Sequence, residues 1–195
     1  MLDLDYQQVY SLIARGEGET LDFKHSITSV LKIAKAIAAF ANHKGGLLLV
    51  GVKDNGKIAK INTEEEIYML EAAVEKCKPR IDFEIQEITL DGRSILAMKV
   101  EPGQEKPYLA LDENNKWLAY VRVKDSNVLA NWIWLQVSKN QVAKKNLKLE
   151  YHGIDETVLK FIAENPLTTQ RAISKGLKLN FRKVGQTLVK LVGMG

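Results

Sequence analysis

The 195-residue sequence has little of what would cross-link, interrupt or anchor a chain: one cysteine, four prolines and 7% aromatic residues. A single thiol excludes an internal disulfide and fits a reducing compartment. The longest nearly uncharged apolar stretches, Ala36–Asn42 and Leu47–Val52, fall well short of the ~20 residues that a membrane span needs. The first residues are acidic rather than basic, unlike a signal peptide. We therefore predict a cytoplasmic globular protein with no membrane contact.

Positive charge is scarce in the first part of the chain and concentrated in the last. The whole sequence has 28 basic and 24 acidic residues, a net charge of +4. Residues 139–195 hold eleven bases and four acids, a net charge of +7, which leaves −3 on residues 1–138. Such asymmetry predicts a C-terminal part that faces nucleic acid. The alternative is a basic tail that is only solvated.

Hydrophobic periodicity predicts three helices in the first ~135 residues. Apolar residues recur at helical spacing over residues 3–14 and 30–41, and Gly45-Gly46 suits a tight turn from the second helix into a strand. Thr63 and Glu66 have the spacing of a capping box. The helix that they open would bury Ile67, Leu70, Val74 and Cys77.

Six segments have the pattern of β-strands: Thr20–Lys24, Leu47–Val52, Lys57–Ile61, Phe83–Leu90, Ser94–Val100 and Trp117–Val123. The uninterrupted apolar run of the second predicts a central strand buried on both faces. Asp54-Asn55-Gly56 and Asp91-Gly92 are turn sequences that predict two hairpins. The first part is therefore predicted to be α+β, a mixed sheet of about six strands with three helices. Residues 128–146 are predicted to be helical and to join it to the rest of the chain.

Residues 151–195 predict three short helices. Asn165-Pro166 ends the first, Thr168 is the expected N-cap of the second, and Asn180 caps the third. The predicted core sides are Ile154, Val158, Phe161 and Ile162 in the first helix, Ala172 and Ile173 in the second, and Val184, Leu188 and Leu191 in the third.

The last two of these helices have the layout of a helix-turn-helix, whose second helix enters the major groove. Its predicted exposed face carries Arg182, Lys183, Gln186, Thr187 and Lys190. Arginine and glutamine can bond base edges in pairs, and lysine neutralises phosphate. Arg171 and Lys175, on the preceding helix, are further candidates for nucleic-acid contact. The alternative is a small helical bundle that mediates dimerisation.

This C-terminal segment resembles the winged-helix domains of bacterial transcription regulators. The sequence stops at Gly195, where the β-wing of that family should follow, so the wing is expected to be missing or very short. Because helix-turn-helix proteins usually bind paired half-sites, the resemblance also implies a homodimer.

Three stretches of the first part resemble the Schlafen AlbA-like domain family, in the family's order and over about residues 10–130. Glu17–Lys24 resembles the opening G-E-x-E-T-x-E-F-K, Phe40–Gly56 resembles F-A-N-x-x-G-G-x-L-x-I-G-V-x-D-x-G, and Ala119–Val123 resembles A-Y-V-R-V. The resemblance implies an α+β domain that occurs in bacterial regulators, often beside a winged helix, with a proposed role in nucleic-acid binding.

The same resemblance implies an alternative function. In vertebrate Schlafen proteins, related domains form an RNA-cleaving core that uses three acidic residues. Carried over by position, the first two are Glu17 and Asp22, and the third falls in Gly51–Gly56, where Asp54 is the only acid. If the third acid belongs at position 53, which is often acidic in the family, the triad is broken, because this chain has Lys53. Such carboxylates would hold Mg²⁺ or Mn²⁺ and position a water for attack on a phosphodiester.

Basic residues of the first part are weaker candidates for nucleic-acid binding. Lys24 and Arg122 lie inside the family motifs, and the others are His25, Lys32, Lys35, Lys44, Arg80, Lys106 and Lys124. Each could instead pair with an acid, which leaves oligomerisation or ligand sensing as a third reading of the protein. The histidines and Cys77 have no metal-binding spacing, so no cofactor is expected outside the nuclease alternative.

The predicted organisation is a Schlafen AlbA-like domain over residues 1–137, a helical connector over 138–150 and a helix-turn-helix over 151–195. The main functional prediction is a DNA-binding transcriptional regulator with the third C-terminal helix as its recognition helix. RNA is the alternative nucleic-acid partner, and a metal-dependent RNase is the alternative activity.

Overall fold

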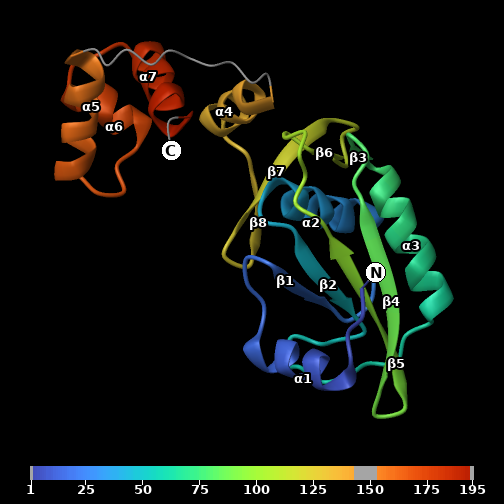
Figure 1. Cartoon of the computed structure of the whole chain (residues 1–195). Helices are drawn as coiled ribbons and strands as arrows, with labels where there is room; N and C mark the ends of the chain where they lie inside the picture. The colour runs from blue at the N-terminus through green and yellow to red at the C-terminus, as the bar shows by residue number, and fades with distance from the viewer. Residues whose placement is uncertain (1, 143–152, 194–195) are drawn as a thin grey trace. The chain divides into compact units, whose positions relative to one another are not determined.

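The computed structural model describes residues 2–142 and 153–193 of the chain. Seven helices and eight strands lie in these residues (Figure 1), which divide into two units, Met1–Ala130 and Asn131–Gly195. The division precedes helix α4 (Trp132–Val142), which belongs to the second unit. The remainder of the predicted connector, residues 143–150, lies outside the described residues.

A mixed four-stranded sheet forms one half of the first unit. Its strand order is β1 (Leu21–Lys24), β2 (Gly46–Val50), β5 (Arg93–Val100) and β4 (Phe83–Leu90). β1 and β2 are parallel, and the other neighbours are antiparallel. β2 is an inner strand with neighbours on both sides, which confirms the prediction from its uninterrupted apolar run.

The β4–β5 hairpin is also confirmed. Leu90 pairs with Arg93, so the loop has two residues, Asp91 and Gly92. Their φ angles are 51° and 71°, which is the left-handed pair that a type I′ turn requires. The Asp-Gly sequence suits this turn because both residue types tolerate positive φ.

The second sheet is antiparallel and was only partly predicted. It contains β3 (Cys77–Lys78), β6 (Leu109–Leu111), β7 (Trp117–Val123) and β8 (Ser126–Leu129). Of these, only β7 was expected from the sequence. The predicted strand 57–61 does not form, since only one isolated bridge joins Val52 to Ile58. The α+β class is confirmed, with eight strands in two sheets among the described residues rather than about six in one.

β8 corrects the expected helix over residues 128–146. Lys124 has a left-handed φ of 55°, and the chain reverses there so that Val128 pairs with Val121. An edge strand of four residues is too short for its hydrophobic periodicity to distinguish it from the start of a helix. The helix itself, α4, begins only at Trp132.

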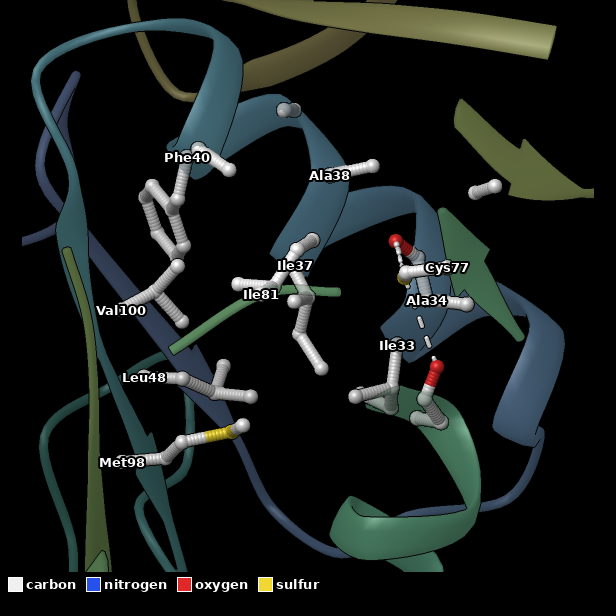
Figure 2. Close-up of a cluster of buried hydrophobic side chains, with 14 of the residues drawn as sticks. Ile33, Ala34, Ile37, Ala38, Phe40, Leu48, Cys77, Ile81, Met98 and Val100 are labelled. Carbon is white, nitrogen blue, oxygen red and sulfur yellow. Dashed lines mark hydrogen bonds between the residues drawn. The ribbon is translucent and has the colours of Figure 1, made fainter. Parts of the chain in front are cut away.

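Helix α2 (Val30–Asn42) packs against both sheets through the main hydrophobic core. Figure 2 shows Phe40 and Ile37 of α2 beside Leu48, Met98 and Val100 of the first sheet. The helix is buried on most of its circumference, because Tyr120 and Ala110 of the second sheet belong to the same cluster. Gly45, with φ of 75°, donates its N–H to the Phe40 carbonyl and closes the turn into β2.

Helix α1 (Tyr6–Arg15) packs against the face of the first sheet opposite to α2. Val9 is fully buried in a second cluster with Phe23, Leu49 and Ile95. Leu48 faces the α2 side and Leu49 the α1 side, as alternation along a strand requires. Asp5 caps α1, and its carboxylate accepts the N–H of Gln8 at 2.8 Å.

Cys77 lies in β3 rather than on the third helix, where the sequence placed it. Its Sγ donates to the carbonyls of Ala34 and Ala73, as the dashed lines in Figure 2 show. Burial raises the pKa of Cys77 to about 12, so the thiol stays protonated at neutral pH.

Helix α3 (Thr63–Glu75) begins where expected, but the predicted capping box is wrong. Asn62 is the N-cap residue and makes no side-chain cap bond. Glu66 instead turns inward, is buried, and accepts the N–H of Ile27 at 2.9 Å. The carboxylate therefore joins the helix to the loop before α2. Burial raises the pKa of Glu66 above its ordinary value.

Replacing Glu66→Gln is expected to leave the first unit as stable or slightly more stable at neutral pH. The amide oxygen still accepts from Ile27, but no charge is buried. Because the folded-state pKa is raised, the native state of the wild type gains stability below the ordinary pKa and loses it as pH rises through the raised value. Urea unfolding between pH 4 and 8 should show this dependence in the wild type and not in Glu66→Gln.

The matched change Glu66→Ala separates the hydrogen bond from the charge. It removes both, and the unpaired Ile27 N–H should cost about 1–3 kcal/mol at every pH. Equal stability of the alanine and glutamine variants would contradict the assigned contact.

The second unit has a three-helix core in its described part. Helices α5 (Gly153–Glu164), α6 (Gln170–Gly176) and α7 (Phe181–Gly193) each contribute one fully buried residue, namely Val158, Ile173 and Val184. Around them pack the partly buried residues Ile154, Phe161, Ile162, Leu177, Leu179, Leu188 and Leu191.

Two details of the predicted helices need correction. The N-cap of α6 is Thr169 rather than Thr168, and its hydroxyl accepts the N–H of Ala172 at 3.2 Å. Ala172 was assigned to the core, but it is exposed. Consecutive residues of a helix point about 100° apart, so Ala172 faces solvent while its neighbour Ile173 is buried.

No described helix combines the length and the apolar character that crossing a bilayer requires.

Candidate nucleic-acid interface

Arg122 of β7, predicted to contact nucleic acid, is buried inside the first unit and 3% exposed. Its Nη2 donates to Asp22 Oδ1 at 3.1 Å and to the Leu21 carbonyl at 3.1 Å. The same guanidinium donates to the Gly18 carbonyl and to Asn127 Oδ1. It also lies 4.9 Å from the centre of the Phe40 ring. Arg122 therefore joins the two sheets and has no surface to offer a phosphate, which corrects the prediction.

Lys24, the other basic residue inside a family motif, is also engaged internally. Its ammonium lies 2.8 Å from Asp22 Oδ2 and donates to the Phe23 carbonyl at 2.7 Å. Asp22 thus has Arg122 on one oxygen and Lys24 on the other, so this buried carboxylate has a cationic partner at each oxygen.

Two of the three acids carried over from the nuclease alternative come together. Glu17 accepts the N–H of Phe23 at 2.7 Å, and its carboxylate interacts with that of Asp22. Desolvation and the Asp22 charge raise the pKa of Glu17, against the lowering effect of the Phe23 bond. Asp54 is exposed in the turn after β2.

These residues do not fit a divalent metal. Both oxygens of Asp22 already face cationic side chains, which compete with a metal for the same lone pairs. Across residues 2–142 and 153–193, no three acids, histidines or cysteines gather closely enough to hold an ion.

The remaining basic candidates of the first unit divide into paired and exposed residues. Lys35 and Lys44 form ion pairs with Glu113 and Glu19. Lys106 is half-buried and donates to the His43 carbonyl at 2.9 Å, and burial lowers the pKa of its ammonium. The exposed bases are His25, Lys32, Arg80 and Lys124.

The second unit presents a basic face on helix α7. Asn180 caps the helix, and its Oδ1 accepts the N–H of Arg182 at 2.8 Å. Arg182, Lys183 and Gln186 are exposed, and their spacing of i, i+1 and i+4 puts them on one side of the helix. None of the three side chains forms an ion pair or a hydrogen bond within the part of the chain that the structure describes. We call these three residues the α7 polar face.

Thr187 and Lys190 do not belong to this face, contrary to the sequence prediction. Thr187 is 6% exposed, because it stands three residues after the buried Val184 and continues the core stripe. Lys190 forms an ion pair with Asp155 near the start of α5, and Asp155 is itself buried. Both residues stabilise the three-helix core.

Helix α6 carries the other two predicted contacts of this unit. Arg171 and Lys175 are exposed and lie one helical turn apart. Residues 177–180 connect α6 to α7, with Lys178 in the left-handed region at φ of 52°. This short connection joins the two helices, and their interpretation as a helix-turn-helix stays a prediction.

A protein-family model described as Schlafen, AlbA_2 matches residues 17–131. The chain belongs to this family. All three motifs quoted above lie inside the matched segment, and the family is linked to nucleic-acid binding. The Schlafen AlbA_2 match nearly coincides with the first structural unit, so helices α5–α7 lie beyond it.

Among solved structures, the chain is similar to the DIP2311 protein from Corynebacterium diphtheriae, known from a crystal structure. The identity is 16% and the TM-score 0.47, over 84% of this chain and 34% of that chain. This chain therefore spans about a third of the length of that protein. No curated protein matches the chain.

Sequence reasoning missed the structural role of Asn42, which precedes the Gly45-Gly46 turn. Its Nδ2 donates to the carbonyls of Tyr108 and Tyr120, and its Oδ1 accepts the N–H of Tyr108. The available signal was an amide at the end of an otherwise apolar helix, which usually means a buried polar group with assigned partners.

Proposed function

We propose that the protein binds duplex DNA through helix α7 and acts as a transcriptional regulator. The observation that carries the proposal is the α7 polar face, which is exposed, lies at the N-terminal end of the helix and has no acidic partner among residues 2–142 and 153–193. In helix-turn-helix proteins the same part of the second helix contacts base edges. Arginine suits guanine, glutamine suits adenine, and Lys183 suits a phosphate.

Two further observations support DNA over a purely structural role for this unit. Arg171, Lys175 and Lys178 are exposed basic residues of this unit, and they add positive charge to helices α6 and α7 and to their connection. Its buried acid, Asp155, is already neutralised by Lys190 and does not offset that charge. The Schlafen AlbA_2 domain would then supply assembly or sensing, and a homodimer would present two α7 helices to paired half-sites.

The double change Arg182→Ala with Gln186→Ala is expected to weaken binding to a selected duplex at least about ten-fold. Each paired contact to a base edge contributes about 1–3 kcal/mol of discrimination, whereas non-specific binding depends on phosphate contacts. The cognate duplex is first selected from a random library with the full chain. Dissociation constants are then measured at two salt concentrations for that duplex, a scrambled duplex and a transfer RNA.

The matched control is Arg15→Ala with Gln104→Ala, which removes the same side-chain types from exposed positions of the first unit. It should bind the selected duplex like the wild type. Equal affinity of the two double variants would remove α7 as the recognition helix. Tighter binding to transfer RNA than to any duplex would replace DNA by RNA as the partner.

A further inference from the structure

The second unit contains a pocket of about 450 Å³ between α4, the α5–α6 loop and α7. Its apolar lining includes Ile162, Ile173 and Leu188 from the three-helix core. Trp132 of α4 forms part of the wall and is 48% exposed. This volume lies within the roughly 300–1,000 Å³ typical of small-molecule sites, which are mostly apolar with a few polar groups.

Leu167 makes the mouth of this pocket unusual. It lines the pocket, yet its side chain is fully exposed to solvent. Its backbone is held in the left-handed region at φ of 62°, where a branched apolar residue is rarely found. An apolar side chain in a strained and solvated position gains from any molecule that covers it.

Gln170 supplies a polar group in the pocket and a connection to α7. Its Nε2 donates to the Phe181 carbonyl at 2.8 Å, at the first residue of α7. Its Oε1 accepts no hydrogen bond from the described residues, so it remains available to a donor. The Thr168 hydroxyl, which also lines the pocket, has no hydrogen bond among those residues either.

Helix α7 packs closely against Trp132 and Gln170, two residues that line the pocket, at Gly185. A Cβ on Gly185 would lie 3.0 Å from Trp132 Cζ3 and 2.7 Å from Gln170 Nε2, closer than side chains normally approach. Gly185 is the immediate neighbour of Gln186 on the α7 polar face. A molecule in the pocket would therefore touch residues that set the position of this helix.

We infer that this pocket is a binding site for a small, largely apolar ring compound that carries an O–H or N–H donor. The ring packs between Trp132, Leu167 and Leu188, and the donor bonds Gln170 Oε1. Binding itself is independent of the proposed function. Only its effect on DNA affinity depends on it.

The test measures the binding of 2-naphthol and of 2-methoxynaphthalene to the full chain, without DNA, by isothermal titration calorimetry. The two probes have the same ring system, but only the naphthol can donate. We expect saturable one-to-one binding of 2-naphthol and about five- to ten-fold weaker binding of the ether, the usual effect of one hydrogen bond. Absence of saturable binding, or equal affinity for the two probes, would overturn the assignment.

Two variants locate the site. Leu167→Gly should unfold at the same or a higher temperature, since glycine tolerates φ of 62°, and yet bind 2-naphthol several-fold more weakly. Thr168→Trp should fill the mouth and abolish binding, whereas the control Thr157→Trp, at an exposed position of α5, should not. Wild-type affinity in both pocket variants would exclude this pocket.

A final arm measures duplex affinity with and without saturating 2-naphthol in the wild type and in Thr168→Trp. A change confined to the wild type supports coupling to α7, and no change in either overturns the coupling. A chain that binds 2-naphthol but no duplex would overturn the proposed function and support the pocket. These outcomes keep the two proposals distinguishable.

Discussion

Replacing Arg122→Ala is expected to lower the free energy of unfolding of the first unit by about 3–5 kcal/mol, because its buried partners, one of them a carboxylate, lose their guanidinium donor. Asp22 would lose the guanidinium and keep only Lys24, and the Gly18 and Leu21 carbonyls would lose their donors. Arg122→Lys should recover only part of the loss, since an ammonium cannot reproduce the planar fork that reaches four groups.

Hydrogen exchange with urea titration would measure this effect separately in each unit. The β1 and β7 peptides should lose protection in Arg122→Ala, and the α5–α7 peptides should not. The control Arg80→Ala removes an exposed arginine of the same unit and should stay within about 0.5 kcal/mol of the wild type. Equal midpoints for the two alanine variants would contradict a structural role for Arg122.

Replacing Asn42→Asp is expected to destabilise the first unit by at least about 3 kcal/mol at neutral pH. The two shapes are nearly identical, but a carboxylate would face the Tyr108 and Tyr120 carbonyls at 2.7 and 2.8 Å, where the amide now donates. Because a carboxylate oxygen and the two carbonyl oxygens are all hydrogen-bond acceptors, none of the three would have a donor there in this buried site. Only the bond from the Tyr108 N–H would survive.

This variant should regain part of its stability as pH falls. Its new carboxyl group would have a folded-state pKa above the unfolded value, so protonation favours the native state and supplies one donor. Thermal unfolding at pH 4 and pH 7 measures the difference. Asn115→Asp is the matched control, since Asn115 is exposed in the β6–β7 turn, and it should show little change at either pH. A neutral Asn42→Asp would contradict the observed amide contacts.

Both residues lie in stretches through which the family is recognised, and both bond internally. Asn42 belongs to the F-A-N stretch and Arg122 to the A-Y-V-R-V strand. Their contacts join α2 to the second sheet and the second sheet to β1. In this chain these motif residues account for the architecture of the domain. The proposal relies on exposed basic groups that have no partner in the described part of the chain, and these lie in the helical unit outside the family match.

Local sequence sufficed where a short-range signal fixes the backbone. The Asp91-Gly92 turn, the apolar run of β2 and the periodicity of α2 each predicted their element, because turn chemistry and side-chain alternation act within a few residues. The short strands β6 and β8 were missed, since their stability depends on pairing with β7 rather than on their own pattern.

The charge division and the three C-terminal helices were also predicted from the sequence, because net charge and helical periodicity need no knowledge of distant contacts. The fate of individual charges was not. The sequence predicted that Arg122 and Lys190 contact nucleic acid and that Glu66 caps a helix, but each side chain bonds a partner at least 35 residues away in the chain. Only the tertiary structure brings such partners together. It therefore decided which polar groups hold the fold and which, like those of the α7 polar face, are exposed with no partner among the described residues.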